Sequence, residues 1–324
     1  MLWSADKTSE LQEKTTMTTL LMITALLMLA IPQQPPDLSD QVTPEERQKI
    51  ISAIPQKSRA GARHSRKLLV MALNIRDGQV RKGHASIPAG NLALRLMGEK
   101  TGAYEVTFSD DVNMLGRENL ARFDAICFNN TVGVLTEDPE LRRSLLDFVA
   151  GGKGFVGLHA AGATFVQWPR YDQFPEFGAM LGGYENGGHP WKPDETITLR
   201  VEDRQHPLNR AFQADRFKIS DEVFQFQAPY SRANLRVLLS IDTSKTDMDP
   251  ARRFLPERFA DRDFAISWVK TYGRGRVFYS SLGHNPHIFW NRPVLEHFLA
   301  GIQFALGDLD ADTTPVPAPA GGQR

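Results

Sequence analysis

A glycine-rich turn, a short apolar strand and a histidine together constrain this chain more than any other stretch. Residues 151–153 form the turn, residues 154–158 form the strand, and His159 follows, succeeded by two alanines. A G-x-S-x-G nucleophile elbow has the same order, with a reactive side chain at the tip of a sharp turn and small residues beside it. A histidine at the tip indicates proton transfer or metal binding instead of acyl transfer. The alternative is a histidine that only ends a strand.

Apolar or alternating runs are interspersed with helical patterns through the first half of the chain. Near-continuous apolar runs are typical of parallel strands that are covered on both faces. The runs lie at residues 67–74, 104–108, 123–129 and 154–158, and the helical patterns at 88–100 and 136–150. This order predicts an α/β fold with a doubly wound, mostly parallel sheet. An antiparallel addition is expected at residues 196–201, 235–241 and 264–281, before a last helix at 293–306.

The chain is predicted to contain one folded α/β domain, at residues 67–307. Residues 37–66 are charged and broken by prolines, and Thr43–Pro44 predicts a short helix within this linker. Residues 308–324 are rich in proline, alanine and glycine and are expected to form a disordered tail.

Residues 1–36 are expected to act as a signal or anchor segment. Residues 20–31 are an apolar run that suits the core of a signal peptide and is shorter than the ~20 residues of a bilayer span. This favours export to the periplasm or the extracellular space. The alternatives are an uncleaved anchor and a true start at Met17, because the flanking charges and the cleavage site are poor.

Charge and cysteine content exclude several classes of protein. The chain has 38 basic and 38 acidic residues, so its net charge gives no reason to expect a nucleic acid or an anionic membrane as partner. The single cysteine, Cys127, lies in an apolar run, which excludes a disulfide framework and any Cys-x-x-Cys motif.

Histidines follow three of the predicted strands. His84, His159 and His284 each come after an apolar run, and ligands bind at the carboxyl ends of strands in open α/β sheets. Asp221 and Glu222 form a carboxylate pair whose charges would suit acid–base work. The alternatives are a loop histidine in solvent and an acidic surface turn.

An aromatic, glycine-rich segment follows the elbow. It suits either sugar stacking or ordinary packing. Its candidates for binding a substrate are Trp168, Tyr184, His189 and Trp191, with Tyr171 in the same loop.

Several motifs in the same order resemble those of the ThuA (trehalose utilisation) family. They are residues 157–161, the loop that ends at His189–Pro190, residues 206–208, Asp221–Glu222, and the closing segment 268–284. The resemblance spans residues 67–307 and implies a class I glutamine-amidotransferase-like, flavodoxin-like fold. Amidotransferases have a cysteine where His159 stands and a glutamate where Pro286 stands, so the resemblance argues against glutamine hydrolysis.

The resemblance implies carbohydrate metabolism. ThuA-like proteins are associated with the use of disaccharides and with 3-keto sugars made by partner oxidoreductases. On this hypothesis the chain is a sugar isomerase, lyase or hydrolase. His159 and His284 would be the acid–base pair, Glu222 or Asp221 would orient one of them, and His84 and His189 would bind sugar hydroxyls. The sequence also allows a homo-oligomer.

Two other hypotheses stay open. His84, His159, His189 and His284, with Glu222, could hold a divalent metal, although their spacing is not a local metal motif. The chain could instead be a non-catalytic module that binds a carbohydrate or a protein, because a fold alone does not give a function.

Overall fold

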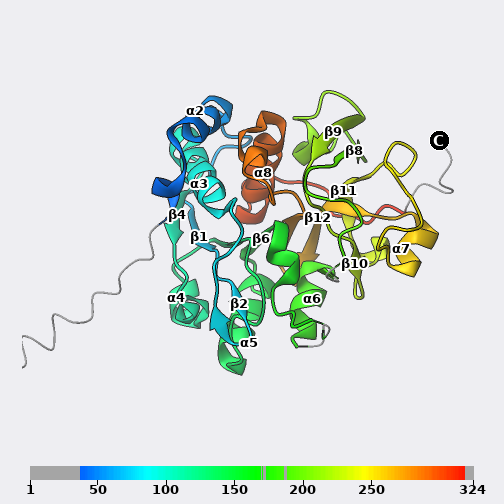
Figure 1. Cartoon of the computed structure of the whole chain (residues 1–324). Coiled ribbons are helices and arrows are strands. Elements are labelled where there is room, and N and C mark those ends of the chain that lie inside the picture. The colour runs from blue at the N-terminus through cyan, green and yellow to red at the C-terminus, as the bar shows by residue number, and fades with distance from the viewer. Residues whose placement is uncertain (1–36, 169, 171–172, 186–187, 318–324) are drawn as a thin grey trace, which may run out of the picture. The chain divides into compact units, whose positions relative to one another are not determined.

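The computed structural model describes residues 37–168, 170, 173–185 and 188–317 (Figure 1). The predicted signal or anchor segment and Tyr171 lie outside these residues. Among the helices that are described, none is both long and apolar enough to cross a membrane.

A nine-stranded mixed sheet forms the centre of the fold. Its order is β4-β1-β5-β6-β13-β12-β11-β8-β9. The first five of these strands run parallel to one another and the other four are antiparallel. Their bounds are β1 Lys67–Met71, β4 Glu105–Phe108, β5 Ala125–Asn129, β6 Gly154–Leu158, β8 Thr196–Val201, β9 Arg216–Ser220, β11 Arg236–Ile241, β12 Ala265–Tyr272 and β13 Gly275–Ser280. The predicted mostly parallel sheet with an antiparallel addition is confirmed.

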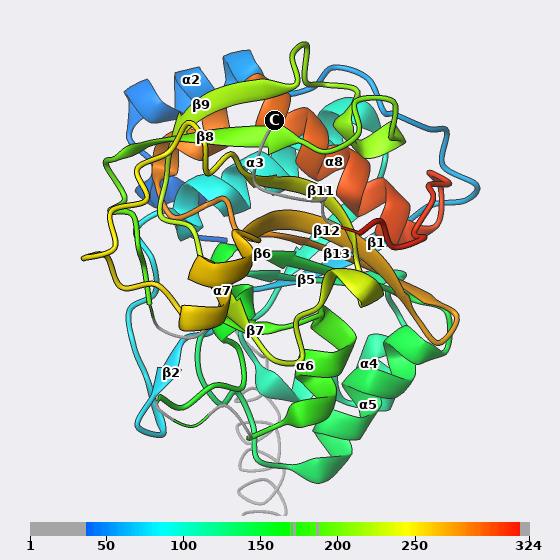
Figure 2. The ribbon, with the colours of Figure 1, turned by 90° about the vertical axis from the view of Figure 1, so that its right-hand side faces the viewer.

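Helices cover both faces of the sheet, and Figure 2 shows α2, α3 and α8 on one side and α4, α5 and α6 on the other. The bounds are α2 Pro44–Ala53, α3 Ile87–Thr101, α4 Arg117–Leu120, α5 Pro139–Ala150, α6 Pro175–Leu181, α7 Pro256–Asp261 and α8 Arg292–Leu306. Short strand pairs join β2 Ile75–Arg76 to β3 Gln79–Val80, and β7 Tyr184–Glu185 to β10 Phe226–Gln227. The central strands β5 and β6 are buried throughout because helices pack on both of their faces.

The segment before the sheet belongs to the fold and is more than a linker. Thr43 and Glu46 form a reciprocal capping box that starts α2. Ile50 of this helix is fully buried, and the Asn91 side chain of α3 donates to the Asp37 carbonyl. Residues 37–53 therefore pack against α3 on one side of the sheet instead of only leading into the domain.

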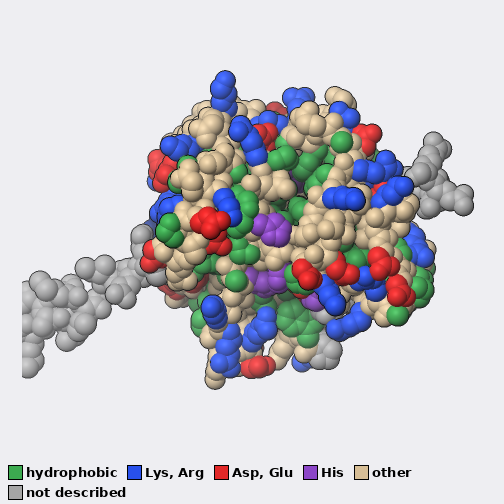
Figure 3. Space-filling model, turned by 45° about the horizontal axis from the view of Figure 1, so that its top comes forward, with side chains coloured by type: hydrophobic (Ala, Val, Ile, Leu, Met, Phe, Trp, Pro, Cys, Tyr) green, Lys and Arg blue, Asp and Glu red, His purple; other side chains and the backbone are tan. Residues whose placement is uncertain are grey.

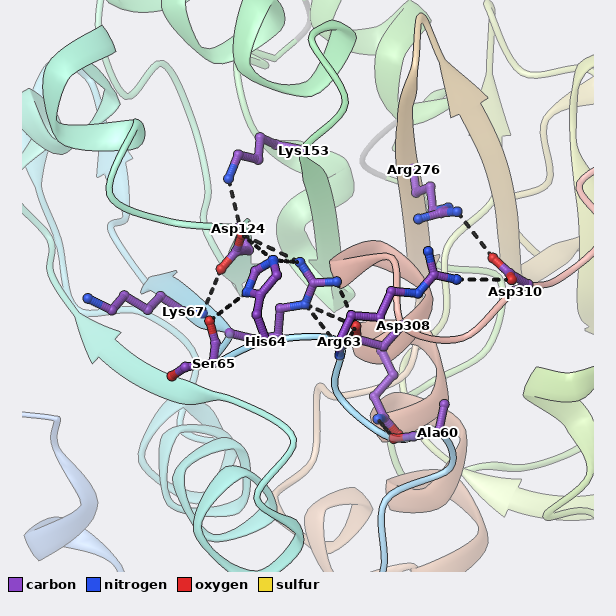
Figure 4. Close-up of polar contacts among 12 residues, drawn as sticks. Ala60, Arg63, His64, Ser65, Lys67, Asp124, Lys153, Arg276, Asp308 and Asp310 are labelled. Carbon is purple, nitrogen blue, oxygen red and sulfur yellow. Dashed lines mark hydrogen bonds and ion pairs between the residues drawn. The ribbon is translucent and has the colours of Figure 1, made fainter.

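The first residue of the expected disordered tail, Asp308, belongs to the folded domain. Asp308 is buried and accepts hydrogen bonds from the Arg66 guanidinium at 2.6 and 3.0 Å. Figure 4 shows the surrounding charge network, in which Lys153 reaches Asp124 and Arg276 reaches Asp310. Paired opposite charges of this kind tie the chain after α8 to the start of β1.

Burial of His297 predicts an acid-sensitive core. The ring, on α8, is fully buried between the Leu208 carbonyl and the Ser267 hydroxyl, and burial lowers its pKa to about 4. Because the unfolded chain binds this proton near pH 6.5, stability is present above pH 6.5 and is lost as the pH falls toward 4. The difference corresponds to roughly 3 kcal/mol. We expect His297→Gln to show a smaller loss between pH 7.5 and 5 in urea unfolding. The exposed His287→Gln is the control and should show the pH dependence of the wild type. The same pH dependence of stability in His297→Gln and the wild type would contradict this prediction.

Candidate functional site

The elbow predicted at the end of β6 is present. His159 has a φ of 45°, a left-handed conformation that costs a non-glycine residue roughly 1–2 kcal/mol. The Tyr279 hydroxyl donates to the His159 carbonyl at 2.6 Å and holds the turn. A Cβ atom at Gly157 would come within 2.8 Å of the Tyr279 ring, so the tight turn requires a residue without a side chain there. The imidazole that this turn presents is fully buried.

Three histidines from different loops meet at the carboxyl end of the sheet. The rings of His84 and His159 have centroids 5.0 Å apart, and that of His284 lies 5.2 Å from the first and 5.1 Å from the second. In Figure 3 histidine side chains gather near the centre of the face that is shown. Parallel strands end at one edge of a sheet, which is why the loops after β1, β6 and β13 can place these rings together.

Glu222 lies at the centre of the imidazoles. Its Oε1 atom is 3.3 Å from His284 Nδ1, 3.7 Å from His189 Nδ1 and 3.9 Å from His159 Nε2. Glu222 follows β9, the far edge strand, in a stretch with no regular secondary structure. The pairing of this carboxylate with the histidines was predicted from the sequence by analogy only, and the structure brings them into contact distance.

Asp221 holds the loop that carries His284. Its carboxylate is fully buried and accepts the backbone N–H groups of Gly283 at 2.7 Å, of His284 at 3.3 Å and of Asn285 at 2.8 Å. Burial raises the pKa of Asp221 to about 7, against the opposing effect of these N–H donors. Asp221 has no exposed surface, so it positions His284 and does not reach a substrate. Of the two roles that the sequence suggested for Asp221, acid–base work and the orientation of a histidine, its burial fits the second.

The surroundings shift the pKa values of His159 and His284, the two candidate acid–base histidines, in opposite directions. Burial, together with the neighbouring imidazoles, lowers the pKa of His159 well below its usual value. Burial also lowers the pKa of His284, but its hydrogen bond and charge attraction with Glu222 outweigh this and raise the pKa overall. The pKa of Glu222 is correspondingly held below its usual value: burial raises it, but the His284 hydrogen bond and the charges of the surrounding histidines together outweigh burial.

The His159 ring has a defined orientation. Its Nδ1 atom lies 2.8 Å from the Ser281 carbonyl, which accepts a hydrogen bond, so Nδ1 carries the proton and the Nε2 lone pair faces the cluster. Phe224 stacks on the same ring with centroids 4.4 Å apart. Neither Ser281 nor Phe224 was predicted from the sequence, because an ordinary serine and phenylalanine carry no motif.

His189 lies at the rim of the cluster with about a third of its side chain exposed. Its Nε2 atom is 3.9 Å from Oε1 of the buried Glu185. Burial lowers the pKa of His189, although the Glu222 charge opposes the change. Glu185 was not predicted as a site residue, since nothing in the sequence distinguishes it from other acids of the loop.

The aromatic residues expected to stack on a sugar are mostly packed into the core. The Tyr184 hydroxyl donates to the Phe174 carbonyl and accepts the Gly178 N–H, and Trp191 Nε1 donates to the Asp247 carbonyl at 2.8 Å. Both side chains are almost fully buried, so the packing alternative describes them. Trp168 is exposed over 39% of its surface.

Four residues could jointly hold a metal. One ligand atom from each of His84, His159, Glu222 and His284 lies within 4.8 Å of every other. His189, which the sequence hypothesis included among the ligands, lies beside this group and is not part of it.

Comparison with known proteins identifies the family. A sequence model of the ThuA family, described as trehalose utilisation, matches residues 75–305. The chain belongs to the ThuA family. The site described above, from His84 to His284, lies wholly inside the matched region of this ThuA protein.

Solved structures of ThuA-like proteins share the fold. One from Bacteroides uniformis has a TM-score of 0.58 at 18% identity and covers 81% of this chain and 96% of its own. Another, from Parabacteroides merdae, has a TM-score of 0.52 at 17% identity, with 79% and 94% covered. No curated protein matches the sequence. At such identities the likeness shows the fold alone.

Replacing Asp221 by asparagine tests how the His284 loop is held. The amide would turn an N–H₂ group toward a backbone N–H that now donates to a carboxylate oxygen, and we expect a loss of about 1–3 kcal/mol in unfolding free energy. Urea unfolding measures this, with the exposed Asp249→Asn as the matched control. Equal stability of Asp221→Asn and the wild type would show that the loop does not depend on this carboxylate.

Proposed function

We propose that this ThuA protein catalyses proton transfer beside a sugar carbonyl and thereby isomerises or cleaves a 3-keto glycoside or disaccharide. One observation carries the proposal: two solvent-reaching imidazoles, His189 and His284, flank the Glu222 carboxylate at 3.7 and 3.3 Å. Such an arrangement offers a proton acceptor and a proton donor a few ångströms apart. The description of the family as trehalose utilisation supports a disaccharide as the class of substrate.

The proposed step is enolisation. A base removes the proton from the carbon next to the ketone, the C–H electron pair forms a carbon–carbon double bond, and the carbonyl π electrons move to oxygen. The enediolate is neutralised by a proton or a cation at that oxygen. Return of the proton to the other face gives an epimer, and return to the neighbouring carbon gives an isomer. Departure of a group from the β carbon gives cleavage.

Exposure and pKa assign the roles. Both rings reach solvent and face Glu222. His189 is the proposed base because burial lowers its pKa and favours the neutral ring, and His284 is the proposed acid because the effect of burial is outweighed by Glu222, which raises its pKa and favours the protonated ring. The sequence hypothesis paired His159 with His284. The His159 ring has no exposed surface, so we place it behind His284, where Nε2 lies 3.2 Å from His284 Nδ1 and fixes that ring.

Hydrolysis of glutamine is a poor alternative. The elbow carries His159 instead of a cysteine, and Cys127 is fully buried inside β5, where burial raises the pKa of its thiol. The residue two positions after His284 is Pro286 instead of a glutamate. The chain therefore lacks a nucleophile and a third triad member for thioester chemistry.

The proposed substrate requires a preceding reaction. A 3-keto sugar arises by oxidation of a secondary alcohol, so a partner oxidoreductase that accepts the two electrons must act first. Export of the chain, proposed from residues 20–31, would place its own step outside the cytoplasm.

Deuterium exchange tests the proposed chemistry. The purified protein is mixed with a 3-keto disaccharide in deuterated buffer and followed by NMR. We expect deuterium next to the ketone, with or without a rearranged or cleaved product. His189→Gln should slow exchange by about 10²- to 10⁴-fold because it removes the base. Its melting temperature should stay close to that of the wild type, since the ring lies at the rim.

His287→Gln is the matched control. This exposed histidine lies three residues after His284, contacts the Ser220 carbonyl and the Trp290 ring, and should leave the exchange rate unchanged when replaced. If the wild type binds the sugar but gives neither exchange nor product, with or without added Zn²⁺, the enolising function is rejected and a carbohydrate-binding module is favoured instead.

A further inference from the structure

We propose that His84, His159, Glu222 and His284 bind one divalent transition-metal ion. The proposal rests on the proposed function and deepens it: when bound, such an ion would neutralise the enediolate oxygen in place of a proton from His284, which would then serve as a ligand. Its structural basis is independent of the substrate: it rests on how four ligand atoms are spaced, oriented and supported.

The spacing suits direct coordination. Ligand atoms about 2.0–2.2 Å from a common ion lie roughly 3–4 Å from one another. His284 Nδ1 is 3.2 Å from His159 Nε2 and 3.3 Å from Glu222 Oε1, and the last two atoms are 3.9 Å apart. One ligand atom from each of the four residues lies within 4.8 Å of the other three. One ion can therefore contact all of them after small side-chain adjustments.

The nitrogen lone pairs also point the right way. Because His159 donates Nδ1–H to the Ser281 carbonyl, its Nε2 is an acceptor and faces His284 Nδ1. Two imidazole nitrogens at this distance need a proton or a cation between them. His84 Nδ1 is buried and has no hydrogen-bond partner among the described residues. A buried, unpartnered nitrogen beside two others that face each other is better explained by an ion than by one shared proton.

Surrounding groups hold the ligands in place, as is usual at metal sites. The Ser281 carbonyl fixes the tautomer of His159, and Asp221 grips three successive backbone N–H groups around His284. Phe224 stacks on the buried face of His159 and keeps water from that side. A ligand set held by such supports before the ion arrives loses little entropy on binding.

The donor set selects the class of metal. Three imidazole nitrogens and one carboxylate suit Zn²⁺ and neighbouring first-row dications, whereas Mg²⁺ and Ca²⁺ prefer oxygen ligands. No thiolate takes part, since Cys127 is buried within β5. Four protein ligands leave room for a substrate oxygen if the ion expands its coordination. His189 lies outside the set and stays available as the base.

Metal titration tests the proposal directly. The full-length protein is stripped with a chelator and titrated with Zn²⁺ in a calorimeter, and with Co²⁺ in an absorption spectrometer. We expect about one ion per chain and, for Co²⁺, visible bands from nitrogen ligation. Glu222→Gln and His284→Gln should each weaken Zn²⁺ binding by at least about ten-fold. The ion should raise the melting temperature of the wild type more than that of either variant.

His287→Gln is again the control and should bind Zn²⁺ like the wild type. If a variant fails to fold by circular dichroism, His84→Gln replaces it, because this ring is only partly buried. The proposal is overturned if no saturable binding occurs, if the ligand variants bind as tightly as the control, or if Mg²⁺ competes equally with Zn²⁺.

The metal proposal and the proposed function fail separately. Stoichiometric Zn²⁺ binding without deuterium exchange would uphold the site and reject the enolising function. Exchange at full rate in stripped protein that binds no metal would uphold the function and reject the ion.

Discussion

Parallel pairing of β6 with β13 is the constraint on which the candidate site depends. Leu158 lies beside Ser280 at the ends of these strands, so the elbow and the loop to His284 leave the sheet next to each other. The left-handed backbone of His159 then turns its ring beneath that loop, where the Ser281 carbonyl accepts its Nδ1–H. Although 125 positions separate His159 and His284 in the sequence, His159 Nε2 thus lies 3.2 Å from His284 Nδ1.

Asp221 extends this arrangement across the sheet. It follows β9, at the opposite edge from β4, yet its carboxylate binds the backbone after β13. Glu222, the next residue in the chain, thereby lies beside the imidazoles. The antiparallel addition therefore supplies the acidic half of the site, and the parallel part supplies three of its histidines. A buried carboxylate held by three N–H donors makes this connection rigid.

Local sequence patterns predicted most of the fold and part of the site. Apolar runs, proline starts and glycine stops located the strands and helices, and His159, set among small residues after a short apolar strand, predicted the elbow. These patterns could not show which side chains are buried. Tyr184 and Trp191 were candidates for stacking on a sugar, but their polar atoms donate hydrogen bonds to backbone carbonyls inside the core. Nor could they show that Arg66 folds Asp308 back into the domain, or that Glu185 and Ser281 support the histidines, because these contacts join distant segments.

The central claim is that the four converging residues form one chemical centre, and anomalous X-ray scattering tests it most directly. Crystals grown with Zn²⁺ would be measured on both sides of the zinc absorption edge. The account predicts one strong anomalous peak within about 2.0–2.2 Å of ligand atoms from His84, His159, Glu222 and His284. Zinc bound only elsewhere, with these side chains unchanged and the cluster free of anomalous signal, would contradict it.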